Sequence, residues 1–355
     1  MIIQIGPYPP PLGGISIFIK RMNLVLNSKG INNKVWSNSC KHESLQIKSV
    51  KLRNLLKEFL RMHNNIDILH FNITGIKPKI YISILNLIFF RNKKKILTIH
   101  GESKYLYKST YNIMTKVLNT FDTIICVKNG DKSYLQSKGV CKPIYEIPAY
   151  INPIQNQDDF ELIPKDVWNF INKSKFLICG NGAIRFNNNE DLYGLDMLVN
   201  LIKKLRKNNK NVSLLFCVLS VENQSKKEKE YYYYIKEQII KYNLQNNILL
   251  YEVENTEFYP ILQKSNLFIR PTNTDGDAVS LREALYFKVP SIASNVVNRP
   301  DGIVLFNNRD LDSLYLKVND VINNYSNYKN KLNNIQMKDN SQSILDIYNK
   351  LINKK

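Results

Sequence analysis

Two acidic residues eight positions apart, Asp275 and Glu283, mark the segment of the sequence that is best suited to chemistry. The apolar run Leu267–Arg270 before them predicts a buried parallel strand, and the Asp-Gly-Asp sequence at 275–277 predicts the turn that ends this strand. Residues 280–287 predict a helix. The first turn of such a helix presents unpaired backbone N–H groups and the positive end of the helix dipole, so a phosphate could bind there, beside carboxylates that accept from sugar hydroxyls.

This segment resembles the Glu-x7-Glu motif of the retaining family-4 glycosyltransferases, which have the GT-B fold. Asp275 stands where that family usually has Glu, and residues 289–293 resemble the strand after the motif, although Lys288 replaces a common Gly. The resemblance implies that Asp275 orients the hydroxyls of a donor sugar and that Glu283 holds the ribose hydroxyls. The other donor contacts that it implies are Gly276, Asp277, Ala278, Val279, Ser280 and Arg282. The alternative is a surface Asp-Gly turn followed by an ordinary amphipathic helix.

A second candidate site follows the first predicted strand, residues 2–5, where a loop rich in Pro and Gly contains Gly13 and Gly14. Glycine lets a backbone approach a ligand closely, and Ser16 can cap the helix expected after the loop. The loop lacks the G-x-G-x-x-G fingerprint of ordinary dinucleotide-binding proteins. It resembles the Gly-Gly loop of the same glycosyltransferases, which implies contact with the donor diphosphate and the acceptor. A loop without a binding role is the alternative.

Two histidines end predicted strands, on the side where open α/β sheets bind ligands. His100 follows the apolar run 96–99 and resembles the family's histidine beside the donor sugar and the reacting centre, which implies a direct role. His70 lies near the end of the run 67–71 and resembles an upstream histidine with a less constant role. For each histidine, a structural role is the alternative.

The segment expected to open the donor-binding domain departs from the family. Gly180-Asn181 and Tyr193-Gly194 stand where a Gly-Arg and a Lys-Gly pair are usual, so both expected phosphate cations are missing. An enzyme without a metal must neutralise a departing diphosphate with fixed positive groups. The candidates to replace the missing cations are Arg185, which is the first choice because it lies at a predicted strand end, Arg270 and Arg282.

The 355-residue chain is 44% hydrophobic, as expected of a globular protein with two domains. Its net charge is +20, and the excess is concentrated in residues 1–165, which contain 24 Lys and Arg against 10 Asp and Glu. Such a field favours an anionic partner, either nucleic acid or an anionic membrane that carries a phosphorylated lipid. Two segments favour a membrane: residues 48–61 predict a basic amphipathic helix, and residues 80–90 are an apolar run too short to span a bilayer. Each of them could instead be a core helix.

Strand-like and helix-like segments alternate along both halves of the chain, which predicts an α/β protein with parallel sheets. We expect an acceptor-binding Rossmann-like domain over residues 1–165, a nucleotide-sugar-binding Rossmann-like domain over 166–330, and a helical tail over 331–355 that can pack back on the first domain. By resemblance this organisation is the GT-B fold, whose parallel sheets face a central cleft. The five cysteines lack C-x-x-C spacing and favour buried thiols over disulfides or zinc ligands.

The resemblance implies a metal-independent, retaining hexosyltransferase that takes a UDP- or GDP-linked sugar as substrate and uses no cofactor. Its acceptor would be a saccharide linked to polyprenyl diphosphate, in bacterial O-antigen (lipopolysaccharide), capsule or exopolysaccharide assembly. No signal peptide is evident, so we expect a cytoplasmic protein, peripheral on the inner face of the plasma membrane, without a nucleic-acid partner. The alternatives are a nucleotide-sugar epimerase of GT-B architecture, a non-catalytic descendant of the fold, and a basic nucleic-acid-binding protein.

Overall fold

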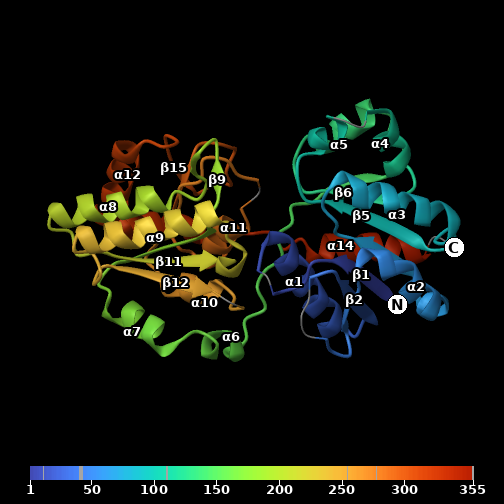
Figure 1. Ribbon diagram of the computed structural model, residues 1–355, viewed down its shortest axis with the longest axis horizontal. Coiled ribbons are helices and arrows are strands. Elements are labelled where there is room, and N and C mark those ends of the chain that lie inside the picture. The colour runs from blue at the N-terminus through green and yellow to red at the C-terminus, as the bar shows by residue number, and fades with distance from the viewer. Residues whose placement is uncertain (11, 40–42, 109–110, 254, 277, 354–355) are drawn as a thin grey trace. The chain divides into compact units, whose positions relative to one another are not determined.

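The computed structural model describes the whole chain except residues 11, 40–42, 109–110, 254, 277 and 354–355. The chain divides into two compact units (Figure 1). The first unit contains Met1–Ile154 together with Asp339–Lys355, and the second contains Gln155–Lys338. The C-terminal segment of the chain therefore belongs to the same unit as the N-terminus.

A parallel sheet of seven strands forms the centre of the first unit. Its strands are β1 (Ile2–Gly6), β2 (Asn33–Ser37), β3 (Ile47–Ser49), β4 (Ile68–Phe71), β5 (Lys94–Ile99), β6 (Thr123–Cys126) and β7 (Ile144–Glu146). They lie in the order β3-β2-β1-β4-β5-β6-β7, and every neighbouring pair is parallel. The central strands are short, almost wholly apolar runs, as expected of parallel strands that are covered on both faces.

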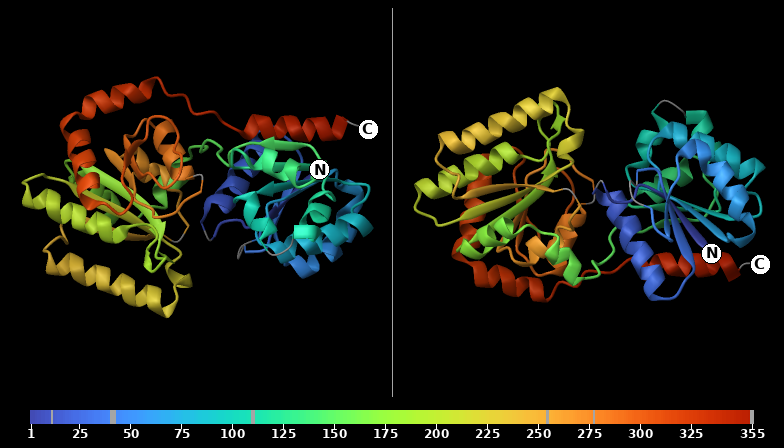
Figure 2. Two further views of the ribbon diagram at one scale, coloured as in Figure 1. Left: turned by 90° about the horizontal axis from the view of Figure 1, so that it is seen from above. Right: turned by 60° about the horizontal axis from the view of Figure 1, so that its bottom comes forward.

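Helices cover both faces of this sheet. They are α1 (Gly14–Ser28), α2 (Leu55–Met62), α3 (Ile76–Ile88), α4 (Tyr111–Leu118), α5 (Asp131–Ser137) and α14 (Ser341–Asn353), with short 3-10 turns at η1 (Leu52–Asn54), η2 (His63–Asn65) and η3 (Ser103–Tyr107). One face packs on α2 to α5 through a cluster that includes Phe59, Phe71 and Ile82. The other face packs on α1 and α14 through a cluster that includes Phe18 and Tyr348, and Figure 2 shows α14, in red, running along this unit.

The second unit has a parallel sheet of six strands and a small antiparallel hairpin. The strands of the sheet are β8 (Leu177–Ala183), β11 (Ser213–Leu219), β12 (Ile248–Val253), β13 (Leu267–Arg270), β14 (Ser291–Ser294) and β15 (Val304–Phe306), and the hairpin is β9 (Phe186–Asn187) with β10 (Glu190–Asp191). The order across the sheet is β12-β11-β8-β13-β14-β15. Strand β13 therefore lies in the interior of the sheet, between β8 and β14.

The helices of the second unit precede, connect and follow its strands. They are α6 (Gln157–Glu161), α7 (Lys165–Lys173), α8 (Leu195–Lys207), α9 (Lys226–Lys241), α10 (Tyr259–Gln263), α11 (Val279–Tyr286), α12 (Leu311–Asn323) and α13 (Tyr325–Asn333), with a 3-10 turn at η4 (Val221–Asn223). A core cluster joins α8, α9 and α12 to one face of the sheet, with Leu201, Phe216 and Val318 among its fully buried members. The sequence prediction of two parallel-sheet α/β units is confirmed.

The first boundary between the units lies before residue 165, the boundary expected from sequence, because residues 155–164 pack on the second unit. The Tyr259 hydroxyl donates to Oδ2 of Asp159 in α6 at 2.8 Å and accepts from the backbone N–H of Asn156 at 2.9 Å. The ring of Tyr325 at the start of α13 contacts Phe176 at 5.6 Å between centroids, so this helix also belongs to the second unit. Residues 155–164 are therefore a structured part of the second unit.

Residues 48–61 do not form the single amphipathic helix expected from their pattern. Residues 47–49 form β3, which pairs with β2, and the helix α2 begins only at Leu55. The local pattern is helical in period, but sheet pairing with β2 supplies backbone hydrogen bonds that the helix would otherwise supply. The apolar run expected as a helix over 80–90 is α3, which begins at Ile76 and ends at Ile88.

Candidate functional site

The segment around Asp275 has the strand, turn and helix that its sequence predicts. Ala278 precedes α11 with an extended backbone (φ −75°, ψ 102°), and its carbonyl accepts from the N–H of Leu281 at 3.1 Å. Gly276 is exposed, and among the described residues no atom lies within 4 Å of the position that a Cβ would take. The backbone before α11 is thus open to a ligand. Asp277, another predicted donor contact, lies outside the described residues.

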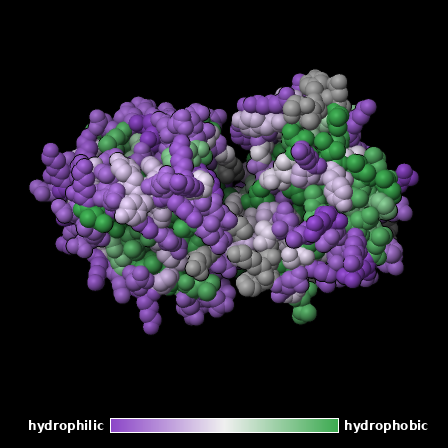
Figure 3. Space-filling model, viewed as in Figure 1, coloured by the Kyte–Doolittle hydropathy of each residue, from purple (hydrophilic) through white to green (hydrophobic). Residues whose placement is uncertain are grey.

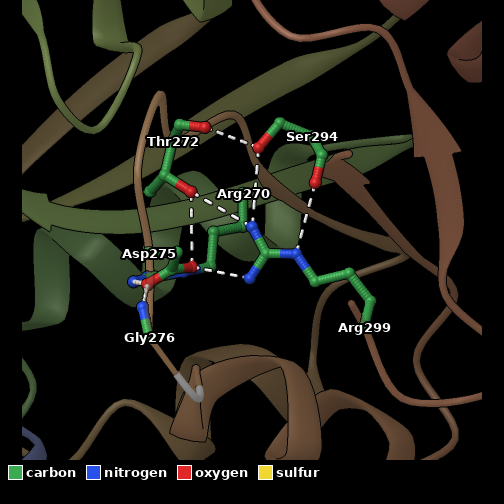
Figure 4. Close-up of polar contacts among 6 residues, drawn as sticks. All are labelled: Arg270, Thr272, Asp275, Gly276, Ser294 and Arg299. Carbon is green, nitrogen blue, oxygen red and sulfur yellow. Dashed lines mark hydrogen bonds and ion pairs between the residues drawn. The ribbon is translucent and has the colours of Figure 1, made fainter. Parts of the chain in front are cut away.

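The carboxylate of Asp275 is the centre of a buried network (Figure 4). Arg270 donates from Nε to Oδ2 at 2.6 Å and from Nη2 to Oδ1 at 2.8 Å. Arg299 donates from Nη1 to Oδ2 at 2.7 Å. The hydroxyl of Thr272 and the backbone N–H of Gly276 add contacts of 3.3 Å and 3.0 Å. A carboxylate has about four lone-pair sites, so these donors leave none for a sugar hydroxyl in this arrangement.

Two guanidinium groups face one carboxylate in this network. The side chains of Arg270, Asp275 and Arg299 are 12%, 8% and 2% exposed. Burial alone would raise the pKa of Asp275, but the charges and hydrogen bonds of the two arginines outweigh burial and lower this pKa to about 2. Asp275 is therefore ionised at neutral pH and fixes the loop between β13 and α11.

Arg299 is a member of the network that sequence reasoning does not identify. It lies beyond the end of β14, and its guanidinium donates to the carbonyl of Ser294 and to the hydroxyl of Thr272, each at 3.2 Å. Because β14 is the neighbour of β13, a loop that follows β14 returns to the end of β13. The sequence does contain a signal, since an arginine before a Pro-Asp-Gly turn follows a predicted strand by a few residues.

The other predicted donor contacts lie on α11. Glu283 is 4% exposed and Ser280 is 7% exposed, and residues three apart lie on the same side of a helix. Val279 and Arg282 are half-buried, and Ala278 is buried. The structure therefore brings Ser280 and Glu283 to one buried side of the first turns of α11, directly after the loop that Asp275 holds.

Arg185, the first candidate for a phosphate cation, is paired with an acid of the same unit. Its Nη1 lies 2.9 Å from Oε2 of Glu228, and its side chain is 36% exposed. It also donates to the backbone carbonyls of Ile184 at 3.0 Å and Asn223 at 3.4 Å. Glu228 forms the capping box of α9 with Ser225, so Arg185 ties the loop after β8 to the start of α9. It is not part of the Asp275 network.

Packing explains two glycines beside Asn181 and Tyr193, the positions where the family has its two cations. A Cβ on Gly182 would lie 2.3 Å from the ring of Tyr193, so the chain needs glycine here to accommodate the tyrosine. Gly194 has φ +67°, and a Cβ on it would lie 2.5 Å from the carbonyl oxygen of Pro271. The guanidinium carbon of Arg270 lies 5.5 Å from the centre of the Tyr193 ring. Arg270 therefore places a positive charge beside the position of the missing lysine.

In the first unit, Gly13 and Gly14 begin α1. Gly13 precedes the helix with an extended backbone, its N–H donates to the Ser16 hydroxyl at 2.9 Å, and its carbonyl accepts from Ile17 N–H at 2.9 Å. Neither glycine has a positive φ, and no atom of the described residues lies closer than 4.0 Å to a Cβ built on either. Backbone conformation and packing therefore do not require glycine at these two positions. A remaining reason for glycine is the open space that it leaves for a ligand.

His100 lies at the carboxyl end of β5, as predicted, and is half-buried. Its Nε2 lies 2.9 Å from Oδ1 of Asn72, and its ring contacts Phe18 edge-on at 5.3 Å between centroids. Burial lowers the pKa of His100 to about 3, and the charges of His70 and Lys79 contribute in the same direction. The imidazole is neutral at neutral pH, so it can act as a hydrogen-bonding group and not as a fixed cation.

His70 has a structural role. It is fully buried in β4, and its two ring nitrogens contact the hydroxyl of Tyr348 at 2.6 Å and that of Thr98 at 2.7 Å. Burial lowers the pKa of His70 to about 3, so the ring is neutral and one nitrogen donates while the other accepts. Tyr348 belongs to α14, so this histidine connects β4 and β5 to the C-terminal helix.

Among the residues that the structure describes, no group of three or more His, Cys, Asp or Glu side chains could hold a metal ion. Cys126, Cys179 and Cys217 are buried free thiols, as expected, whereas Cys141 is free but exposed, and Cys40 lies outside the described residues. Within the described part of the chain, no helix combines the length and apolar character needed to cross a membrane.

Comparisons with known proteins agree with this geometry. Residues 171–336 match the family described as Glycosyl transferases group 1. The chain is similar to a glycosyltransferase from Rickettsia africae ESF-5, with 17% identity, a TM-score of 0.70, and coverage of 100% of this chain and 99% of that chain. It is also similar to sucrose-phosphate synthase from Thermosynechococcus elongatus, with 14% identity, a TM-score of 0.71 and full coverage of both chains. No curated protein sequence matches the chain.

A third solved structure adds a ligand to the comparison. The Anabaena protein HepE in complex with UDP is 13% identical, with a TM-score of 0.63 and coverage of 97% of this chain and 94% of that chain. These likenesses extend over both units, whereas the family match lies within the second unit, which contains Asp275 and Glu283. Residues 171–336 therefore match the glycosyl transferases group 1 family, which supports a glycosyltransferase, and the chain has the fold of the GT-B glycosyltransferases.

Proposed function

We propose that this glycosyltransferase transfers a hexose from a UDP- or GDP-linked donor to a saccharide acceptor, with retention at the anomeric carbon and without a metal or other cofactor. The observation that carries the proposal is Glu283, a carboxylate that is 4% exposed in the first turns of α11, the helix that follows β13. The family match over residues 171–336 and the UDP and UDP-glucose complexes of HepE support a nucleotide-sugar donor.

The chemical requirement of the reaction is the control of charge. An oxocarbenium-like sugar and a diphosphate leaving group form together, and fixed dipoles and cations stabilise the diphosphate without a metal. The N–H groups and the helix dipole at the start of α11 are one source of positive potential. The guanidinium groups of Arg270 and Arg299 are the second, and Arg282 on α11 is a further donor contact. A phosphate oxygen of the leaving group takes the acceptor proton, so no side-chain nucleophile is assigned.

The roles of the two carboxylates differ in this proposal. Glu283 accepts hydrogen bonds from the ribose hydroxyls of the donor. Asp275, which the sequence suggests as the contact to sugar hydroxyls, acts instead as a positioning residue, because Arg270, Arg299 and its other donors occupy its lone pairs. The arginines and the backbone of Gly276 and Ser280 then face the diphosphate. Arg185, paired with Glu228, is a less direct candidate for this role than the sequence suggests.

The first unit binds the acceptor in this proposal. Gly13 and Gly14 approach the donor diphosphate and the acceptor through their backbone, and neutral His100 hydrogen-bonds a sugar hydroxyl near the reacting centre. The basic character of residues 1–165 favours an acceptor on an anionic carrier, such as a saccharide linked to polyprenyl diphosphate. Such an acceptor would place the protein in bacterial surface-polysaccharide assembly, on the inner face of the plasma membrane.

Calorimetric titration with UDP, GDP and their sugar conjugates, each with EDTA present, tests the donor site. We expect one nucleotide series to bind and the Glu283→Gln variant to bind it at least about tenfold more weakly, because hydrogen bonds to a charged group contribute about 1.5–3 kcal/mol. Glutamine keeps the shape of the buried side chain, and its thermal unfolding shows whether the fold is intact. Glu237→Gln, an exposed position on α9, is the matched control and should bind as the unchanged protein does.

Two results would contradict the proposal. If none of the nucleotides binds, the donor site is absent and a non-catalytic role replaces it. If a nucleotide binds only when a divalent cation is supplied, the fixed cations assigned above are insufficient. Conversion of the donor to another sugar without an acceptor would identify an epimerase.

A further inference from the structure

Helix α3 presents a large apolar face to solvent. Its inner face is buried through Ile82 and Leu85, which are 0% and 4% exposed. Its outer face carries Ile84, Leu87 and Ile88, which are 50%, 55% and 57% exposed. Residues three and four apart lie on the same side of a helix, so these three aliphatic side chains form one stripe. The helix is therefore apolar on both sides although only one side meets the core, and the exposed side remains unexplained by folding.

The exposed stripe continues onto neighbouring residues. Phe89, immediately after α3, is 42% exposed, and Leu60 on α2 is 53% exposed. The end of α3 lies near α2, because the ring of Phe90, two residues after α3, is 4.4 Å from the ring of Phe59 in α2 between centroids. Figure 3 shows a hydrophobic area where Figure 1 places α3. We define the α2–α3 surface as Leu60, Ile84, Leu87, Ile88 and Phe89 with the surrounding Lys57, Arg61, Arg91 and Lys93.

The segment of the chain that carries this apolar stripe is rich in positive charge. Residues 55–95 contain eight Lys and Arg against two Asp and Glu. Lys79 and Lys95 are buried, and the other cations reach the surface. Both acids are already paired: Glu58 contacts Lys48 at 2.6 Å, and Asp67 contacts the N-terminal amine. The surface therefore combines exposed aliphatic side chains with a positive charge that its own acids do not neutralise.

The chemistry of the surface distinguishes three possible partners. A second copy would present the same positive charge, so a symmetric contact through this face would be repulsive. Single-stranded nucleic acid is held by stacking on aromatic side chains, but the centre of this surface is aliphatic. An anionic bilayer matches both features, because aliphatic side chains enter the acyl boundary while Lys and Arg meet the phosphate headgroups.

We propose that the α2–α3 surface docks this protein on an anionic phospholipid bilayer. Helix α3 starts just after the carboxyl end of β4 and runs back towards the opposite edge of the sheet, so Leu87 and Ile88 lie far from the sheet edge that carries His100 and Gly13. Docking through this face leaves the ligand-binding edge of the unit uncovered. The purpose of docking rests on the proposed lipid-linked acceptor, but the surface itself does not depend on it.

Vesicle sedimentation of the full chain tests this proposal. We expect binding to vesicles of phosphatidylcholine with phosphatidylglycerol, much weaker binding to phosphatidylcholine alone, and loss of binding at high salt. Leu87→Ser with Ile88→Ser should lower the partition coefficient at least about tenfold, because each half-exposed aliphatic side chain loses an apolar contact of about 1 kcal/mol. Ile240→Ser with Leu316→Ser, at exposed aliphatic positions of the second unit, is the matched control and should leave binding unchanged.

Several outcomes would overturn the inference. The first is that the α3 double variant binds vesicles as well as the unchanged protein does, and the second is that neutral and anionic vesicles bind equally. The third is that single-stranded RNA displaces the protein from vesicles by binding the same sites. The fourth is that light scattering shows a dimer which the double variant abolishes. Nucleotide titration of the double variant separates this inference from the proposed function. Vesicle binding without nucleotide binding would overturn only the donor site, and nucleotide binding without vesicle binding would overturn only the docking surface.

Discussion

The carboxylate of Asp275 shows how partners decide the role of a residue. Its position in the motif suggests a contact to sugar hydroxyls, yet Arg270 and Arg299 take both of its oxygens. Aspartate is shorter than the glutamate usual at this position, so its carboxylate stays close to the backbone, where the N–H of Gly276 also reaches it at 3.0 Å. The motif thus has a negative charge at this position, but the carboxylate binds the two arginines of the protein.

The low pKa of Asp275 predicts how stability depends on pH. Its pKa is about 2 in the folded protein and about 3.9 when unfolded, so its stabilising effect is complete above about pH 5 and is lost as the pH falls towards 2. Asp275→Asn leaves two buried guanidinium groups without their carboxylate and should lower the free energy of unfolding by about 3 kcal/mol at pH 7. The difference from the unchanged protein should shrink as the pH falls.

Urea unfolding at a series of pH values measures this difference. Asp301→Asn, an exposed acid in the loop after Arg299, is the matched control and should change the free energy of unfolding by less than about 0.5 kcal/mol. A constant difference between Asp275→Asn and the unchanged protein from neutral to acid pH would contradict the buried ion pairs.

At the scale of secondary-structure elements, both units place the residues proposed to bind the ligand where a strand ends and a helix begins. In the first unit this is the β1–α1 junction with Gly13 and Gly14, and in the second unit it is the β13–α11 junction with Gly276. Within the described part of the chain, no atom lies closer than 4.0 Å to a Cβ built on any of the three glycines, and none of them has a positive φ. Their shared feature is therefore room beside the backbone at a helix start, which suits a diphosphate.

Gly14→Ala tests whether this room has a function. Alanine at the first residue of α1 meets no atom within 4 Å among the described residues and favours the helix, so stability should stay equal or rise by up to about 1 kcal/mol. Sugar transfer should nevertheless fall at least about tenfold, because the methyl group enters the space assigned to the substrate. Thermal unfolding and initial transfer rates measure the two effects.

The other end of the same helix offers a control of opposite sign. Gly30 has φ +67°, so Gly30→Ala should cost about 1 kcal/mol of stability and leave transfer unchanged. Full transfer activity in Gly14→Ala would show that the open space at the start of α1 receives no substrate.

The elements also show what the sequence can and cannot predict. Apolar runs such as Leu267–Arg270 identify central strands, because a strand covered on both faces needs apolar residues throughout. The edge strand β3 does not stand out in the sequence, since residues 47–49 are half-covered and their helical period is overridden by pairing with β2. Arg299 escapes prediction for a different reason: its contact with Asp275 depends on which strands are neighbours, and that information is not local in the sequence.

At the scale of the whole molecule, the two units have separate cores, and the C-terminal residues of the chain complete the core of the first unit. Residues 339–355 return to the first unit, where Ile344 and Tyr348 of α14 are buried against the sheet. The hydrogen bond between Tyr348 and His70 joins two residues that are 278 positions apart. The first unit is therefore complete only after the second unit has been synthesised. Its stability depends on α14, which follows the second unit in the sequence.

Separate cores predict two unfolding transitions that respond to different changes. Tyr348→Phe leaves a buried nitrogen of His70 without its partner, which should cost about 1–3 kcal/mol and lower only the transition of the first unit, by about 2–4 °C for each kcal/mol. A bound nucleotide should raise the transition of the second unit, which contains Glu283. Calorimetric scans of the full chain measure both, with exposed Tyr233→Phe as the matched control. A single transition that both changes shift equally would show that the two units unfold together.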